Sequence, residues 1–111
     1  MENICKFVIN SITEAIYTGK YHPGEKIPSI REWSHKLGVS VNTVHKAIKY
    51  LCDVGIIVRG KRNYQVTNNS LNIENYRKMI RQKEINKLLN KMEEIRISKE
   101  EIISLVNMLI K

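Results

Sequence analysis

The chain has 111 residues, and 19 Lys and Arg against 11 Asp and Glu give it a net charge of +8. This length allows one compact domain with a small appendage and excludes an enzyme-sized second domain. The charge favours a polyanionic partner, although ribosome-associated and membrane-surface proteins share this property. We expect a cytoplasmic protein, because the sequence has no secretory signal and no apolar run reaches the ~18 residues of a membrane span.

The first predicted element is an amphipathic helix that begins before Asn10 and continues to Thr18. Gly19 supplies the left-handed turn that ends it. The loop over 20–27 is too rich in Pro and Gly for regular structure, and we expect Ile27 to plug the core beside it. Apolar residues recur in the helix every three or four positions, at Ile4, Val8, Ile12, Ala15 and Ile16.

Two short helices follow, over Ser29 to Leu37 and 41–54, with a hinge at Leu37-Gly38-Val39 between them. Ser29 and Glu32 have the spacing of a capping box at the start of the first helix. Ser40 caps the second helix, and Gly55 ends it. The spacing is that of a helix-turn-helix. Core residues are predicted at Ile30, Trp33 and Leu37 in the first helix and at Val44, Ala47, Ile48 and Leu51 in the second.

A β-hairpin is predicted next, because β-branched and aromatic runs over 56–59 and 64–67 are separated by Gly60-Lys61-Arg62-Asn63. The tip of this hairpin carries two positive charges. Three helices closed by a basic hairpin form a winged helix-turn-helix, so the predicted fold is mainly α with a small hairpin.

The polar stretch over 68–70 separates this winged helix-turn-helix DNA-binding domain, 1–69, from a helical dimerisation segment, 70–111. The segment contains a long helix and a final helix opened by a second capping box at Ser98 and Glu101. Two helices cannot enclose a core by themselves, so they pack either on the first domain or on a second copy; the second choice gives a symmetric homodimer. The apolar residues expected at the dimer interface are Tyr76, Ile80, Leu88, Met92, Ile95, Ile102, Leu105, Val106 and Leu109.

Polar and basic side chains gather at the start of the second short helix, as a DNA recognition helix requires. Asn42 and His45 have the reach for base edges, whereas Ser40, Thr43, Lys46 and Lys49 suit phosphates. Ser29 and Arg31 form a further phosphate anchor at a helix N-terminus, and Lys61 and Arg62 lie against the backbone from the hairpin.

Other kinds of site are not indicated. Cys5 and Cys52 form neither a Cys-x-x-Cys pair nor a metal-ligand spacing, and we interpret them as reduced thiols. The three histidines stand apart from any carboxylate or cysteine cluster, so no metal or other cofactor is expected. No set of nucleophile, base and orienting group is recognisable, so the chain is not expected to be an enzyme.

The run from Gly19 to Glu32 has the form G-x-x-x-P-G-x-x-[IL]-P-S-x-R-E, and Leu37-Gly38-Val39-Ser40-x-Asn42-Thr43-Val44-x-Lys46-Ala47 follows it. Over roughly Ile12 to Thr67, the chain closely resembles the DNA-binding domain of the GntR family of bacterial transcription regulators. With about forty residues after that domain, it is similar to the short YtrA-type branch, which dimerises through two C-terminal helices.

The resemblance implies a homodimeric transcription regulator, most simply a repressor, on double-stranded DNA with a palindromic operator; it leaves any small-molecule effector unidentified. The chain differs from many members of the family at Val41 and His45, where they have arginine. Its hairpin also lacks their second glycine. The remaining alternative is a winged-helix module that binds a protein or RNA through the same basic face. By the resemblance, DNA contacts are expected at Arg31, Ser40, Val41, Asn42, Thr43, His45, Arg59 and Gly60.

Overall fold

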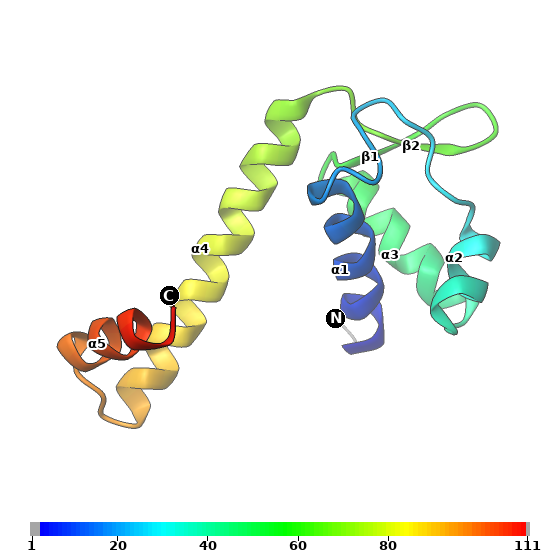
Figure 1. Ribbon diagram of the computed structural model, residues 1–111. Helices are drawn as coiled ribbons and strands as arrows, with labels where there is room; N and C mark the ends of the chain where they lie inside the picture. The colour runs from blue at the N-terminus through cyan, green and yellow to red at the C-terminus, as the bar shows by residue number, and fades with distance from the viewer. Residues whose placement is uncertain (1–2, 111) are drawn as a thin grey trace. The chain divides into compact units, whose positions relative to one another are not determined.

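The computed structural model describes residues 3–110, which form five helices and one two-stranded antiparallel sheet (Figure 1). The chain divides into two compact units, one ending at Tyr76 and the other beginning at Arg77, and a single helix runs across this division. The elements are α1 Asn3–Tyr17, α2 Ile30–Leu37, α3 Val41–Asp53, β1 Ile57–Arg59, β2 Tyr64–Val66, α4 Ser70–Glu94 and α5 Lys99–Leu109.

The core of the first unit forms around α3, which contacts α1, α2 and β1. In Figure 1, α3 lies between α1 and α2, with the hairpin beside it. The predicted core positions Ile27 and Trp33 are buried, as expected, whereas Ile30 and Leu37 are only half-buried. The largest fully buried side chains are Ile12, Ile27, Ile48, Leu51, Ile56, Ile57, Val8, Val44 and Val66.

Two glycines end helices where the sequence predicted them. Gly19 follows α1 with a φ of 82°, and Gly55 follows α3 with a φ of 81°. Both angles lie in the left-handed region, where a Cβ would clash with the backbone. The amide of Ile56 then donates to the carbonyl of Leu51 at 2.9 Å, which turns the chain directly from α3 into the hairpin.

The loop before α2 pairs with the outer edge of the hairpin. Strands β1 and β2 pair antiparallel with Arg59 opposite Tyr64, and each is one residue shorter than predicted. On the far side of β2, the amide of Ile27 donates to the carbonyl of Tyr64 at 3.0 Å, and Lys26 forms a bridge with Gln65. The loop that leads into α2 is therefore fixed to the hairpin.

The start of α4 belongs to the first unit. The Asn72 side chain donates to the carbonyl of Gly55 at 3.4 Å, and the Tyr76 hydroxyl donates to the Tyr50 hydroxyl, also at 3.4 Å. Tyr76, predicted at the dimer interface, is only 7% exposed in the single chain. Its burial, together with the hydrogen bond to Tyr50, raises the pKa of its hydroxyl. Tyr76 is thus packed inside the first unit.

The second unit exposes apolar side chains along both of its helices. The capping box of Ser98 and Glu101 is present at the start of α5, as predicted. No residue of α5 is buried, and Leu105 and Leu109 are 45% and 80% exposed. No helix among residues 3–110 combines the length and the hydropathy that crossing a membrane requires.

Candidate nucleic-acid interface

The N-terminus of α2 is closed by the predicted capping box. The Glu32 amide donates to the Ser29 hydroxyl, and the Ser29 amide donates to the Glu32 carboxylate, both at 3.1 Å. The backbone hydrogen bond from Ser29, and next the contact with its hydroxyl, lower the pKa of the Glu32 carboxyl. Arg31 follows the cap in the first turn and is exposed. A cation at this end opposes the helix dipole, which points to a role other than stabilising the helix.

The start of α3 presents polar side chains on its exposed face. Ser40 caps the helix, because its hydroxyl accepts from the Thr43 amide at 3.1 Å and pairs with the Thr43 hydroxyl at 2.8 Å. One of the two hydroxyl hydrogens is used in that pair, so one is left to donate to a phosphate. The opposite face of the helix is buried through Val44, Ala47, Ile48 and Leu51. The exposed residues of its first nine positions are Val41, Asn42, His45, Lys46 and Lys49.

The hairpin tip is closed without a second glycine. The Gly60 amide donates to the carbonyl of Asn63 at 2.7 Å, and this bond leaves Lys61 and Arg62 at the exposed tip. A Cβ at Gly60 would approach the Asn63 side chain to 3.0 Å and its carbonyl to 3.2 Å. Glycine is therefore favoured here by close packing, since its φ is not in the left-handed region.

Arg59 is held against Tyr64, its partner on the opposite strand. The guanidinium carbon lies 5.6 Å from the centroid of the Tyr64 ring, and Nη1 donates to the Tyr64 hydroxyl at 3.5 Å. The cation–π contact contributes more than the hydrogen bond, because 3.5 Å is at the outer limit of hydrogen-bond length.

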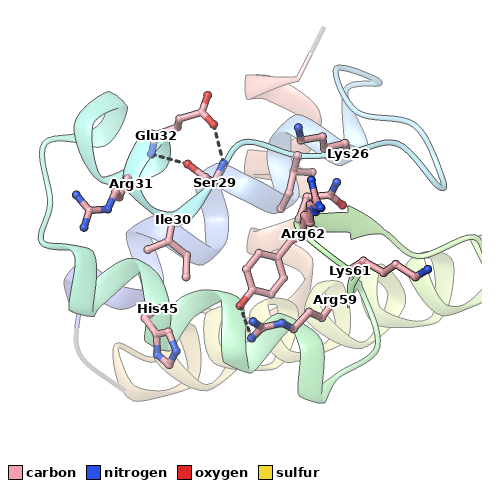
Figure 2. A pocket seen from close by; sticks show the side chains of 12 residues that line it. Lys26, Ser29, Ile30, Arg31, Glu32, His45, Arg59, Lys61 and Arg62 are labelled. Carbon is pink, nitrogen blue, oxygen red and sulfur yellow. Dashed lines mark hydrogen bonds between the residues drawn. The ribbon is translucent and has the colours of Figure 1, made fainter.

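An open hollow of about 550 Å³ lies between the start of α2, the middle of α3 and the hairpin. Figure 2 shows Arg31 and His45 on one side of it and Lys26, Lys61 and Arg62 on the other. Its floor is partly apolar. Five of the lining side chains are Lys or Arg, namely Lys26, Arg31, Arg59, Lys61 and Arg62, and Glu32 is the single carboxylate. Such a concentration of positive charge attracts phosphate groups.

A second hollow of about 260 Å³ adjoins the first along α3 and shares His45, Arg59 and Tyr64 with it. Lys49 lines this second hollow, together with Ile48 and Cys52. Burial, and then the charge of Asp53, raises the pKa of the Cys52 thiol, so the thiol is favoured over the more reactive thiolate.

The structure brings together about half of the residues predicted at the DNA interface. Ser29, Arg31, His45, Arg59, Lys61 and Arg62 line the larger hollow, and Lys49 lines the smaller one. The other predicted residues line neither hollow. Ser40, Val41, Asn42, Thr43 and Lys46 lie on the first two turns of α3 or cap it, and Gly60 shapes the hairpin turn.

The residues that line the hollow include Lys26 and Tyr64, which were not among the predicted DNA contacts. Lys26 reaches it because the loop before α2 pairs with β2, and Tyr64 because it stands opposite Arg59. The predicted hairpin already placed Tyr64 across from Arg59, so the sequence could have predicted their contact. The position of Lys26 depends on a pairing between distant segments, for which the sequence carries no local signal. Among the residues that the structure describes, no group of three or more His, Cys, Asp or Glu could hold a metal ion.

Comparison with known proteins identifies a family. The model of "Bacterial regulatory proteins, gntR family" matches residues 5–63, which is more than half of the chain. Comparison with curated proteins gave no match.

Several solved structures are similar. A GntR family transcriptional regulator from Listeria monocytogenes shares 28% identity over 97% of this chain and 96% of its own, with a TM-score of 0.88. YtrA from Sulfolobus acidocaldarius, a GntR-family transcription factor, shares 36% identity over 96% of this chain and 86% of its own, with a TM-score of 0.56. The DNA-binding domain of AraR, solved in complex with operator ORE1, shares 31% identity over 60% of this chain and 83% of its own, with a TM-score of 0.57.

Proposed function

Because this chain belongs to the GntR family of bacterial regulatory proteins, and is thus a transcription regulator with a DNA-binding domain, we propose that it is a homodimeric repressor of a palindromic operator. Residues 1–69 are the DNA-binding domain in this proposal, and 70–111 the dimerisation segment. The repressor acts in the cytoplasm, where it covers a promoter and excludes the polymerase.

The observation that carries the proposal is the position of the basic hollow beside the exposed face of α3. Five cationic side chains from the loop, α2 and the hairpin surround it. Phosphate contacts of this kind fix the register of a protein on the duplex, and contacts to base edges then select the sequence. The AraR domain, which is similar over 60% of this chain, was solved on its operator, which supports the same use of the winged unit here.

The proposed contacts divide by chemistry. Asn42 and His45 read base edges in the major groove, and Val41 offers an apolar contact for a thymine methyl group. The remaining proposed residues bind the sugar–phosphate backbone, namely Ser29, Arg31, Ser40, Thr43, Lys46, Lys49, Arg59, Gly60, Lys61 and Arg62.

Titration with duplex DNA tests the DNA-binding proposal. Full-length protein should bind random duplex DNA more weakly as salt rises, since bound cations release counterions from the backbone. Selection from a random DNA pool should return a palindrome whose half-site centres lie ~34 Å apart or a multiple of that distance. Absence of binding to any duplex contradicts the proposal and favours a protein or RNA partner.

The proposed homodimer uses the apolar side chains that the second unit leaves uncovered. A single chain exposes Leu88, Ile95, Leu105, Val106 and Leu109 by more than two-fifths each. A protein that remained monomeric would leave these side chains partly in water, where each forgoes a part of the about 1.5–3 kcal/mol that full burial contributes. The interface also includes the half-buried Ile80, Met92 and Ile102, whereas Tyr76 is packed within the first unit.

Sedimentation of charge variants tests the homodimer. Leu105→Glu places a carboxylate in the proposed interface and should produce a monomer. Asn107→Glu adds the same charge to the same helix at a polar, exposed position and should leave the dimer intact. Equal dimerisation of both variants contradicts the proposed interface.

A further inference from the structure

Arg59 is an exposed residue with a long, flexible side chain on the hairpin. Free arginine side chains populate many rotamers, and fixing one against a phosphate reduces the affinity gained by the contact. An arginine that is already ordered in the free protein avoids this loss. The surroundings of Arg59 show how such ordering arises here.

Tyr64 restrains Arg59 in two ways. Its ring lies 5.6 Å from the guanidinium carbon, and its hydroxyl accepts from Nη1 at 3.5 Å. The two residues are also direct partners across the hairpin, so the ring and the stem of the arginine stand on adjacent strands.

Tyr64 is itself held in place, because β2 lies between β1 and the loop before α2. On one edge it pairs with Arg59 of β1, and on the other its carbonyl accepts from the Ile27 amide at 3.0 Å. The Lys26–Gln65 bridge continues this second edge. Neither Gly60 nor the tip residues have such support on both sides.

The restrained guanidinium is directed towards α3. Arg59 lines both hollows, and in each it shares the lining with His45 of α3. Figure 2 shows the two side chains at the larger hollow. Lys49 also lines the smaller hollow. The Arg59 charge thus stands between the hairpin and the exposed face of α3, where a DNA strand passing along that face meets it.

We propose that Tyr64 is a positioning residue that holds Arg59 in the orientation in which it binds a backbone phosphate. This inference rests on the proposed DNA-binding function and adds a residue to it. Tyr64 stabilises the bound orientation of Arg59 in the free protein and does not contact DNA itself.

The expected effect is modest and specific. An exposed cation–π contact corresponds to a factor of about 2 to 5 in an equilibrium constant. Tyr64→Leu should therefore weaken binding to random duplex DNA by about 2- to 5-fold per bound chain. Tyr64→Phe keeps the ring and loses only the long hydrogen bond, so its affinity should remain within about 2-fold of the wild type.

A double-mutant cycle with Arg59→Gln tests the proposal. Four full-length proteins, namely the wild type, Tyr64→Leu, Arg59→Gln and the double variant, are titrated with labelled random duplex DNA at several salt concentrations. Arg59→Gln should lower the salt slope by about one unit per chain. Tyr64→Leu should weaken binding with the slope unchanged, since Arg59 still reaches its phosphate. In the Arg59→Gln background, Tyr64→Leu should have no effect.

Each other outcome has a distinct meaning. An equal loss from Tyr64→Leu with and without Arg59 overturns the inference, because Tyr64 then acts directly or through the fold of the hairpin. If Tyr64→Leu lowers the salt slope of DNA binding by about two or three units, the inference is also overturned. Such a fall means that the whole hairpin has lost its phosphate contacts. If the wild type binds no duplex DNA, both the inference and the proposed function fail.

A measurement on the free protein needs no variant and no DNA. Because the Tyr64 ring faces the guanidinium, the δ-methylene protons of Arg59 should show an upfield ring-current shift in the wild type. Tyr64→Phe should keep this shift. Random-coil values for Arg59 in the wild type overturn the inference even where the DNA-binding function holds.

Discussion

Replacement of Arg31 by Gln separates a phosphate anchor from a base reader. Arg31 lies in the first turn of α2 and lines the hollow together with Lys26, Arg59, Lys61 and Arg62. If these five cations each bind one phosphate, they contribute about −4.5 per chain to the slope of log Kobs against log salt. Arg31→Gln should reduce this slope by about 0.9 per chain, or about 1.8 for a dimer.

The same relation sets the loss of affinity. One phosphate contact contributes about 8-fold per chain at 0.1 M salt relative to 1 M, so a dimer should lose about 60-fold. The loss should be the same on random duplex DNA and on a selected operator. Folding stability should not fall, because the substitution removes a cation from the positive end of the α2 dipole. A weaker complex with an unchanged or higher Tm therefore reports on contact with DNA.

Fluorescence anisotropy over a range of salt concentrations measures both quantities. Lys91→Gln, which removes one charge from the last turn of α4, is the matched control and should leave the slope unchanged. Two results refute the reasoning. A loss confined to the operator makes Arg31 a base reader, and a loss with an unchanged slope removes it from the phosphate contacts.

The remaining predictions concern sequence reading and the α2 cap. Asn42→Ala or His45→Ala should relax the preference at one operator position by about 1–3 kcal/mol; an unchanged selection profile excludes that role. Ser29→Ala should lower the free energy of unfolding by about 1 kcal/mol in denaturant titration, and an unchanged midpoint contradicts the capping geometry. Since folding lowers the pKa of Glu32, the stability difference between the wild type and Glu32→Ala should be present above the unfolded-chain pKa of about 4.3 and vanish as pH falls through the folded pKa.

The hairpin of β1 and β2 departs from the family pattern and still forms a closed turn. The resemblance implied a second glycine near the tip, which this sequence lacks. The structure closes the turn with the bond from the Gly60 amide to the Asn63 carbonyl, and the side-chain amide of Gln65 donates to that of Asn63 at 3.4 Å. Lys61 and Arg62 can therefore occupy the tip without a left-handed residue.

The sequence by itself determined the features that depend on neighbours three or four residues apart. Capping boxes at Ser29 and Ser98, the serine cap at Ser40 and the turn at Gly19 all appear where they were predicted. Each joins groups within one turn of a helix, so spacing and residue type suffice to identify it. The family motif from Gly19 to Glu32 contains two of these local features, the turn at Gly19 and the capping box at Ser29.

Only the tertiary structure decided which distant side chains meet. Tyr76 lies in an apolar stripe and was assigned to the dimer interface, yet it is packed against Tyr50, 26 residues away. Lys26 joins the basic hollow through pairing with Gln65, 39 positions further along. Apolar periodicity indicates that a face is covered, but the partner that covers it is fixed by how the elements pack. The same dependence on packing turns the separate basic residues of the loop, α2 and the hairpin into one surface beside α3.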